Sequence, residues 1–318
     1  MRFAILLIIV FSFGAGAQVR WYNADSMFGP LPAGFHVYRT TDSLDGKPNI
    51  AWYAEADLRA QHLDFTTQIG WGKRLTPTQY YQQENQPMLV INGTFFEFAT
   101  NRNLNLVVRN GQQLAYNVPI VKNRADTTQF YYITRSALGI NKRRKADIAW
   151  VFTDSVSKYP RALLTGPSTA TGSHADPSWP EVKSKLKKGG RKHIKWKIQT
   201  AIGGGPVLLQ MGQVAITNKE ERMFIGGEQD RHPRTAMGYT KGGKLIILVV
   251  EGRNPGKAEG ATLEQEARLL QQLGCHEALN LDGGGSSCML INGKQTIKPS
   301  DKEGQRPVPA VFIIKAVQ

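Results

Sequence analysis

The chain has 318 residues, of which 41% are hydrophobic and 20% are charged, and its formal net charge is +15. This length and composition exclude a disordered chain and a small disulfide scaffold, because one large domain or two ordinary ones can bury a full core. Much of the positive charge lies in two basic runs, at residues 141–145 and 183–197. An anionic polymer is one candidate partner for them. Trp196 is the single aromatic ring of the longer run, so a solvated loop is the favoured interpretation and nucleic acid is not expected.

The first 17 residues have the pattern of a secretory signal peptide. Arg2 precedes an apolar run at residues 3–13, and Ala15-Gly16-Ala17 supply small residues for cleavage. The run is shorter than the roughly 20 residues that span a bilayer. We therefore expect an exported protein, periplasmic or secreted, without a membrane span.

Residues 18–318 are predicted to form a single domain. No linker separates residues 18–87, the N-terminal part, from the motif-bearing residues 88–318. The two cysteines, Cys275 and Cys288, are separated by a predicted strand and a glycine loop, so we do not expect them to pair.

Several segments have the apolar pattern of strands. Residues 244–250 are too continuously apolar for an exposed strand and are predicted to lie inside a sheet. Turn residues predict two hairpins, one around Asn110-Gly111 and one around Gly212. Further strands are predicted at residues 49–58, 88–92, 278–281 and 309–317.

A helix is predicted over residues 262–273, between two of these strands. Thr262 is the N-cap, Gln265 its capping-box partner, and Gly274 the stop signal. A strand, helix, strand unit normally gives two parallel strands with a right-handed crossover. The predicted fold class is therefore α/β (α+β), with a mixed sheet, at least one parallel βαβ unit and helices packed on it.

Polar residues follow both strands of that unit. Glu251 follows the first strand and Asp282 the second, and strands that run the same way end at one edge of a sheet. Open sheets usually bind ligands at this edge. Asn92 follows another buried strand and is expected at the same edge.

The loop "DGGGSS" after the second strand matches no common phosphate or nucleophile signature. No Gly-Lys-Ser/Thr follows it, and Ser286 lacks the Gly-x-Ser-x-Gly context of a hydrolase nucleophile. His232 and His276 lack metal-ligand spacing, so neither a metal nor a cofactor is expected. A carboxylate beside glycine backbone N–H groups suits a substrate with hydroxyls or a phosphate.

Several motifs occur in the order and spacing of the phosphodiester glycosidase family, which this sequence resembles from about residue 88 to the C-terminus. They are "NGTFFE" (92–97), "IGGGPVLLQMGQV" (202–214), "RHPRTAMGY" (231–239), "LVVEGR" (248–253), "ALNLDGGGSS" (278–287) and "RPVPAVFI" (306–313). The sequence departs from the usual motifs at Thr94, Cys288 and Gln305. The resemblance implies an α/β-type catalytic domain that cleaves a sugar-1-phosphodiester at the anomeric carbon. The family's motif residues fall here on Asn92, Gly204, Arg234, Glu251, Arg253, Asp282, Gly283, Gly284 and Ser286.

A phosphomonoester leaving group is a weak base, so one carboxylate suffices where glycosidases usually need two. Asp282 is assigned as that carboxylate, with Glu251 as its alternative or partner. Arg234, Arg253 and the glycine-loop N–H groups are expected to hold the phosphate, and Asn92 and Ser286 to bind sugar hydroxyls.

Two other functions stay open at this point. One is a phosphodiesterase or nuclease that cuts the P–O bond. The other is a non-catalytic protein that binds an anionic cell-surface polysaccharide. The sugar, the aglycone and a possible glycan or cell-envelope polymer that carries them are not determined by the sequence.

Overall fold

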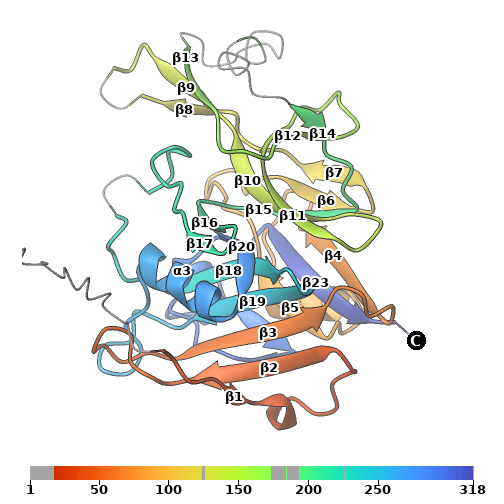
Figure 1. Cartoon of the computed structure of the whole chain (residues 1–318), viewed down its shortest axis with the longest axis vertical. Coiled ribbons are helices and arrows are strands. Elements are labelled where there is room, and N and C mark those ends of the chain that lie inside the picture. Colours follow the sequence, from red (N-terminus) through yellow and green to blue (C-terminus); the bar gives the residue numbers. More distant parts are fainter. Residues whose placement is uncertain (1–17, 124–125, 173–183, 185–192, 225–226, 318) are drawn as a thin grey trace, which may run out of the picture.

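Antiparallel strands make up most of the computed structural model, which describes residues 18–123, 126–172, 184, 193–224 and 227–317 (Figure 1). The predicted signal peptide at residues 1–17 lies outside the described residues. Among those described, no helix has the length and apolar character needed to cross a membrane.

The largest sheet has eight strands in the order β1-β2-β3-β19-β18-β20-β16-β17. The bounds are β1 Tyr22–Asn23, β2 Phe35–Thr40, β3 Ala51–Asp57, β16 Val207–Gln210, β17 Gln213–Val214, β18 Arg234–Thr240, β19 Lys244–Val250 and β20 Cys275–Asn280. The short helix η1 (Asp25–Met27) lies between β1 and β2. β19 is therefore an inner strand, as predicted, paired with β3 on one side and β18 on the other.

Three smaller sheets complete the fold. The five-stranded sheet has the order β22-β21-β5-β23-β4, with β22 Lys294–Gln295, β21 Met289–Ile291, β5 Leu89–Asn92, β23 Ala310–Ala316 and β4 Leu63–Ile69. The seven-stranded sheet has the order β14-β12-β11-β10-β15-β6-β7, with β14 Ile194–Lys195, β12 Arg161–Leu163, β11 Ala146–Phe152, β10 Arg135–Ile140, β15 Thr200–Gly203, β6 Val107–Arg109 and β7 Gln112–Ala115. The three-stranded sheet is β13-β9-β8, with β13 Thr169–Gly172, β9 Phe130–Ile133 and β8 Ile120–Lys122.

One hydrophobic core joins the three larger sheets. Ile247 of β19, Phe312 of β23 and Trp150 of β11 all belong to the same buried cluster. The other face of β19 is also covered, because Leu248 packs in a second cluster with Leu270 of helix α3 (Leu263–Gln272). Burial on both faces is why β19 is apolar at consecutive positions instead of alternating with polar residues.

The predicted fold class is wrong, because the mixed sheet with a parallel βαβ unit does not form. Every strand pairing among the described residues is antiparallel. In the same residues strands far outweigh α-helices, of which the structure gives α1 (Pro77–Gln83) and α3. The chain does pass from β19 through α3 to β20, but β18 lies between these two strands and pairs with both. β19 and β20 still run in the same direction, since each is antiparallel to β18. Figure 1 shows α3 against this part of the sheet.

The local predictions were more successful. Helix α3 has Thr262 as its N-cap and a capping box with Gln265, as predicted. Asn110 and Gly111 have positive φ angles of 51° and 78° in the turn between β6 and β7, and Gly212 has the same conformation between β16 and β17. Residues of this kind are favoured in tight hairpin turns.

The longer basic run is described only in part. Its last residues are built into the fold: Ile194 and Lys195 form β14, and Trp196 is buried and donates a hydrogen bond from Nε1 to Asp147 Oδ2 at 2.8 Å. This end of the run is therefore core structure and not a solvated loop. Cys275 and Cys288 are both buried and unpaired.

Candidate functional site

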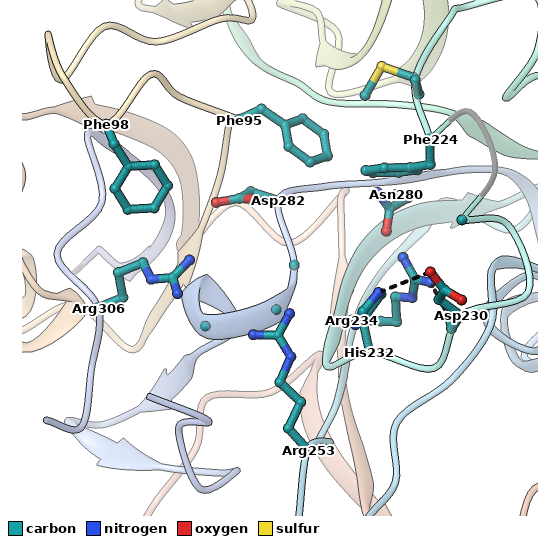
Figure 2. Close-up of a pocket in the computed structure, with 15 residues that line it drawn as sticks. Phe95, Phe98, Phe224, Asp230, His232, Arg234, Arg253, Asn280, Asp282 and Arg306 are labelled. Carbon is teal, nitrogen blue, oxygen red and sulfur yellow. Dashed lines mark hydrogen bonds and ion pairs between the residues drawn. The ribbon is translucent and has the colours of Figure 1, made fainter. Parts of the chain in front are cut away.

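The strand ends of the largest sheet converge on one edge. Arg234 begins β18 and lies opposite Val250, the last residue of β19, while Ala236 lies opposite Asn280, the last residue of β20. The first residue of β18 and the last residues of β19 and β20 therefore lie at one edge of the sheet. This is the edge at which a ligand was predicted to bind. A cavity of about 670 Å³ opens there. It is lined by Phe95, Phe98, Met223, Phe224, Gly227, Asp230, His232, Arg234, Arg253, Asn280, Asp282, Gly283, Gly284, Gly285 and Arg306 (Figure 2).

Asp282 has the chemistry of an acid–base group. The residue as a whole is half-buried, but its Oδ2 atom is shielded from solvent and has no hydrogen-bond partner in the described structure. Burial raises the pKa of Asp282 to about 7, against the opposing effects of Ser286, the Arg306 charge and the Gly283 N–H. A carboxyl group with such a pKa can exchange a proton near neutral pH. The Ser286 hydroxyl is buried and makes no hydrogen bond of ordinary geometry, although it lies close enough to affect this carboxyl group.

Three arginines line the cavity. Arg234 is buried and is held by its bonds to the carbonyl oxygens of Ala261 (2.8 Å) and Asp230 (2.9 Å). Arg253 is exposed at the rim, and Arg306 forms a two-point ion pair with Asp301 at 2.7 and 2.9 Å. Guanidinium groups in this arrangement suit a phosphate or carboxylate ligand.

A buried carboxyl group lies behind Arg234. Glu266 of α3 is fully buried, and neither of its carboxylate oxygens has a hydrogen-bond partner in the described structure. Burial raises the pKa of Glu266 to about 8, opposed by the charge of Arg234. Burial also lowers the pKa of the Arg234 guanidinium, but an arginine stays charged at neutral pH. The charge of Arg234 is therefore only partly balanced by protein groups.

Each glycine of the loop makes room for a specific neighbour. A Cβ at Gly283 would lie 2.9 Å from the Pro233 carbonyl oxygen, and one at Gly284 would lie 2.9 Å from Arg253 Nη2. At Gly285 a Cβ would collide with the Arg306 guanidinium, 2.1 Å away. Gly284 also has a φ of +62°, which disfavours other residues. The missing side chains thus admit two arginines to the loop, as Figure 2 shows.

The loop N–H groups are engaged more than the sequence analysis anticipated. Gly284 N donates to Pro233 O at 2.8 Å, and Ser286 N donates to Gly283 O at 3.2 Å within the short helix η2 (Gly284–Ser286). These two N–H groups are not free to hold a phosphate. Anion binding at this edge therefore depends more on the arginines than on the backbone.

Asn92, predicted to bind a sugar hydroxyl, and Gly204, predicted from the family motifs to belong to the substrate site, both lie outside the cavity. Asn92 is fully buried, and its amide donates to Asp282 O at 2.6 Å and accepts from Cys288 N at 3.1 Å. Gly204 allows close packing, because a Cβ there would lie 2.4 Å from Asn280 O. Neither residue lines the cavity.

Glu251 is placed differently from Asp282. Both of its carboxylate oxygens accept hydrogen bonds, from Asn254 Nδ2 at 3.2 Å and from Lys298 N at 3.0 Å. The side chain is buried and does not line the cavity. In this structure Glu251 connects two loops behind the site.

The fold brings to the cavity several residues that were not predicted from the sequence. Phe95 and Phe224 make an edge-to-face contact with ring centroids 5.7 Å apart, and Arg306 lies over the Phe98 ring at 5.4 Å. Aromatic side chains of this kind offer flat apolar surface to a sugar ring. Phe95 and Arg306 lie within the quoted family motifs, so the sequence could have indicated both as candidate site residues.

His232 and His276, the histidines considered above as possible metal ligands, have different surroundings. His232 lines the cavity, and burial together with the charges of Arg234 and Arg253 lowers its pKa, which favours the neutral ring. His276 does not line the cavity. Among the described residues no group of three or more His, Cys, Asp or Glu side chains has the geometry to hold a metal ion.

Comparison with known proteins places this site in a family. The family model for phosphodiester glycosidase matches residues 85–315, which is more than half of the chain. The chain belongs to the phosphodiester glycosidase family. The match includes β5, the β18–β20 edge and the glycine loop, so the family domain contains the whole cavity.

Individual relatives resemble shorter stretches. The mouse enzyme N-acetylglucosamine-1-phosphodiester alpha-N-acetylglucosaminidase is 38% identical over 68 residues, which is 21% of this chain and 13% of the enzyme. A Bacillus subtilis prophage-derived uncharacterized protein, YomE, is 39% identical over 71 residues, covering 22% of this chain and 11% of that protein. The matched stretch therefore spans little of these relatives' length.

Two solved structures share the fold over most of the chain. The catalytic domain of zebrafish N-acetylglucosamine-1-phosphodiester alpha-N-acetylglucosaminidase, auto-inhibited by its pro-peptide, has a TM-score of 0.56 at 20% identity, covering 94% of this chain and 88% of that one. A hypothetical protein from Synechocystis has a TM-score of 0.59 at 15% identity, covering 94% and 68%. At these identities the comparison supports a common fold for this family member.

Proposed function

We propose that this protein is an exported glycosidase that hydrolyses a sugar-1-phosphodiester at the anomeric carbon. The observation that carries the proposal is the position of Asp282. Its shielded Oδ2, which has no hydrogen-bond partner among the described residues, shares one cavity with Arg234, Arg253 and Arg306. A buried titratable carboxyl group in a cavity that three guanidinium groups also line matches a sugar linked to phosphate. Family membership supports the same class of reaction.

The chemistry needs few catalytic groups. The bond between C1 and the phosphate oxygen breaks, the electron pair leaves with the phosphomonoester, and positive charge develops at C1 and the ring oxygen. The ionised Asp282 carboxylate would stabilise that charge, attack C1 itself, or activate the water molecule that attacks C1. The departing phosphate needs no proton from a general acid, so Glu251 is not required at the reacting centre.

The arginines would supply the other half of the mechanism. Negative charge on the departing phosphate increases as the C–O bond breaks, and fixed cations at that point stabilise the transition state more than the ground state. Arg253 lies next to Gly284 and Arg306 lies next to Gly285, so we assign the phosphate to the part of the cavity beside these two glycines. Arg234 adds a buried positive charge on the β18 side of the cavity.

The cellular location follows from the sequence rather than from the fold. The pattern of residues 1–17 supports export to the periplasm or the medium, where the substrate would be a small sugar phosphodiester or a sugar-phosphate on a cell-envelope polymer. The identity of the aglycone is left to the assay. Neither a metal nor a cofactor is part of the proposed mechanism.

The test is a screen of sugar-1-phosphodiesters with the protein lacking residues 1–17. We expect release of free sugar and a phosphomonoester, with the rate dependent on the sugar. Hydrolysis in oxygen-18 water identifies the bond that is cut. Label in the sugar supports the glycosidase, whereas label in the phosphate would establish a phosphodiesterase instead. Binding of these compounds without any turnover would favour a carbohydrate-binding protein.

A further inference from the structure

Asn280 presents a buried hydrogen-bond acceptor to the cavity. It is the last residue of β20, the residue is 1% exposed, and its Nδ2 donates to Gly205 O at 2.9 Å. That bond fixes the orientation of the amide. The Oδ1 atom must then face away from Gly205, and it has no hydrogen-bond partner in the described structure. Figure 2 shows the oxygen of Asn280 directed into the cavity.

A buried acceptor without a donor is unfavourable and therefore uncommon. Leaving such a group unsatisfied costs its full desolvation free energy, so most buried polar atoms in folded proteins have partners. At Asn280 this free-energy cost is removed if a bound ligand donates a hydrogen bond to Oδ1. We therefore expect a ligand bound in this part of the cavity to carry an N–H or O–H group that donates to Asn280 Oδ1.

The position of Asn280 relative to Asp282 limits which donor this is. Leu279 and Leu281 point into the core, so the alternating residues Asn280 and Asp282 face the cavity together. Residues two apart in an extended chain have Cα atoms separated by roughly 7 Å, a span that lets one side chain contact C1 and the other contact a substituent on an adjacent ring atom. If Asp282 acts at C1, the Asn280 acceptor lies beside the neighbouring ring atoms. One of these is the ring oxygen, which has no donor, and the other is C2.

We propose that Asn280 Oδ1 accepts a hydrogen bond from the donor on C2 of the sugar, either a hydroxyl or an amide N–H. This inference rests on the proposed function and names its substrate class: sugars with a donor at C2, and not 2-deoxy sugars. Hydrogen bonds at C2 strengthen as the oxocarbenium ion develops. The contact therefore acts on the chemical step as well as on binding.

The experiment compares substrates and variants together. The methyl 1-phosphodiesters of glucose, N-acetylglucosamine and 2-deoxyglucose are assayed with the wild type and with Asn280→Ala. The measured quantity is the ratio of kcat/KM for the better C2-donor substrate to that for the 2-deoxy substrate. Because 2-deoxy compounds are intrinsically more reactive, only the change of this ratio between wild type and variant is interpreted.

We expect Asn280→Ala to lower this ratio about tenfold to a hundredfold, mostly by slowing the C2-donor substrate. Asn280→Asp keeps an acceptor at the same place, so its ratio should stay near that of the wild type even if turnover falls. The better of glucose and N-acetylglucosamine identifies a hydroxyl or an amide donor. An unchanged ratio in Asn280→Ala would overturn the proposal.

Asn117→Ala is a matched control. Asn117 is also a buried amide, but its Oδ1 accepts from Leu106 N at 2.8 Å and its Nδ2 donates to Val151 O at 2.9 Å, away from the cavity. Its replacement should lower the melting temperature and leave the substrate ratio unchanged. A matching change of ratio in this control would show a general loss of structure and would also overturn the proposal.

A measurement on the wild type alone keeps the proposal testable if the Asn280 variants do not fold. The binding of glucose 1-phosphate and of 2-deoxyglucose 1-phosphate is compared by calorimetry. We expect the 2-deoxy compound to bind at least about tenfold more weakly, and equal affinities would contradict the role of Asn280. Binding with this preference but without hydrolysis of any phosphodiester would retain the C2 contact and reject the proposed catalysis.

Discussion

The Asn92 amide donates a hydrogen bond to the Asp282 carbonyl oxygen across 2.6 Å and so connects the end of β5 to the proposed catalytic residue. Asn92 Oδ1 accepts from Cys288 N at the other end of the glycine loop, and from Thr235 Oγ1 at 3.0 Å. One buried side chain thus holds both ends of the loop that carries Asp282. The two sheets to which β5 and β20 belong are connected at this point.

Asn92→Ala should therefore damage both stability and turnover. The change leaves a buried carbonyl and a buried N–H without partners, so we expect the free energy of unfolding to fall by about 2–4 kcal/mol. The rate should fall more than substrate binding, because the Asp282 main chain is no longer fixed. Denaturant melts and steady-state kinetics measure the two effects. Unchanged turnover in a destabilised variant would show that the loop does not need this connection.

Asp282→Asn should abolish most turnover while the protein stays folded. The substitution keeps the shape of the side chain and removes its charge, and a central electrostatic group typically contributes about a hundredfold or more to the rate. Asp147→Asn is the matched control, because Asp147 also has a pKa raised by burial but bonds Trp196 away from the cavity. Near wild-type rates in Asp282→Asn would reject the catalytic assignment and make Asp230, the other carboxyl group that lines the cavity, the next residue to test.

The raised pKa of Asp282 predicts a pH dependence that does not need a substrate. Its folded-state pKa of about 7 lies above the ordinary aspartate value, so the folded state binds this proton more tightly than the unfolded state does. Stability from this group is present at low pH and is lost as the pH rises toward 7. The melting temperature of Asp282→Asn, relative to the wild type, should therefore increase from pH 5 to pH 8. Taking this difference cancels the similar contribution expected from Glu266, and a constant difference would contradict the raised pKa.

The same titration should appear in the kinetics. If Asp282 acts as a carboxylate, kcat/KM of the wild type rises with pH through about 7 in the free enzyme. The phosphodiester stays anionic over this range, so the substrate does not contribute a competing titration. A rate that falls through this range would indicate that the protonated carboxyl group is the active form.

Gly285→Ala tests whether the glycine run exists to admit the arginines. Its Cβ would lie 2.1 Å from Arg306 Nη2 and 2.2 Å from Asp301 Oδ1, so the ion pair must move. A displacement of this size in a phosphate-binding group is expected to lower kcat/KM about tenfold to a hundredfold. Gly242→Ala is the control, because its Cβ would meet only Thr240 Oγ1 at an ordinary 3.5 Å. Full activity of Gly285→Ala would show that Arg306 is not needed where it lies.

The N-terminal part should be inseparable from the rest of the domain. β3 pairs with all seven residues of β19, and β4 pairs with β23 from Leu63 to Ile69. Removing residues 18–87 would expose the edges of two inner strands, which favours aggregation. Limited proteolysis should therefore give no stable fragment that begins near residue 88. Isolation of a soluble, folded fragment of residues 88–318 would contradict the single-domain prediction.

Local structure in this protein was determined by the sequence. The capping box of Thr262 and Gln265, the Asn110-Gly111 turn and the consecutive apolar residues of β19 each act over a few neighbouring residues, so their effect is visible in the chain itself. The same reasoning placed Asp282 after a strand, at the edge of the sheet where the cavity opens. It also located the resemblance that the family match at residues 85–315 confirms.

Strand partners and side-chain neighbours were decided only by the tertiary structure. A strand, helix, strand pattern does not reveal that β18 fits between β19 and β20, because strand pairing depends on residues far apart in the chain. For the same reason, Arg306 reaches the glycine loop from a segment more than twenty residues further on, and both carboxylate oxygens of Glu251 bond Asn254 and Lys298. The sequence indicated two candidate carboxylates, Glu251 and Asp282. Of these two, Asp282 is the one that lines the cavity and has an oxygen without a hydrogen-bond partner among the described residues.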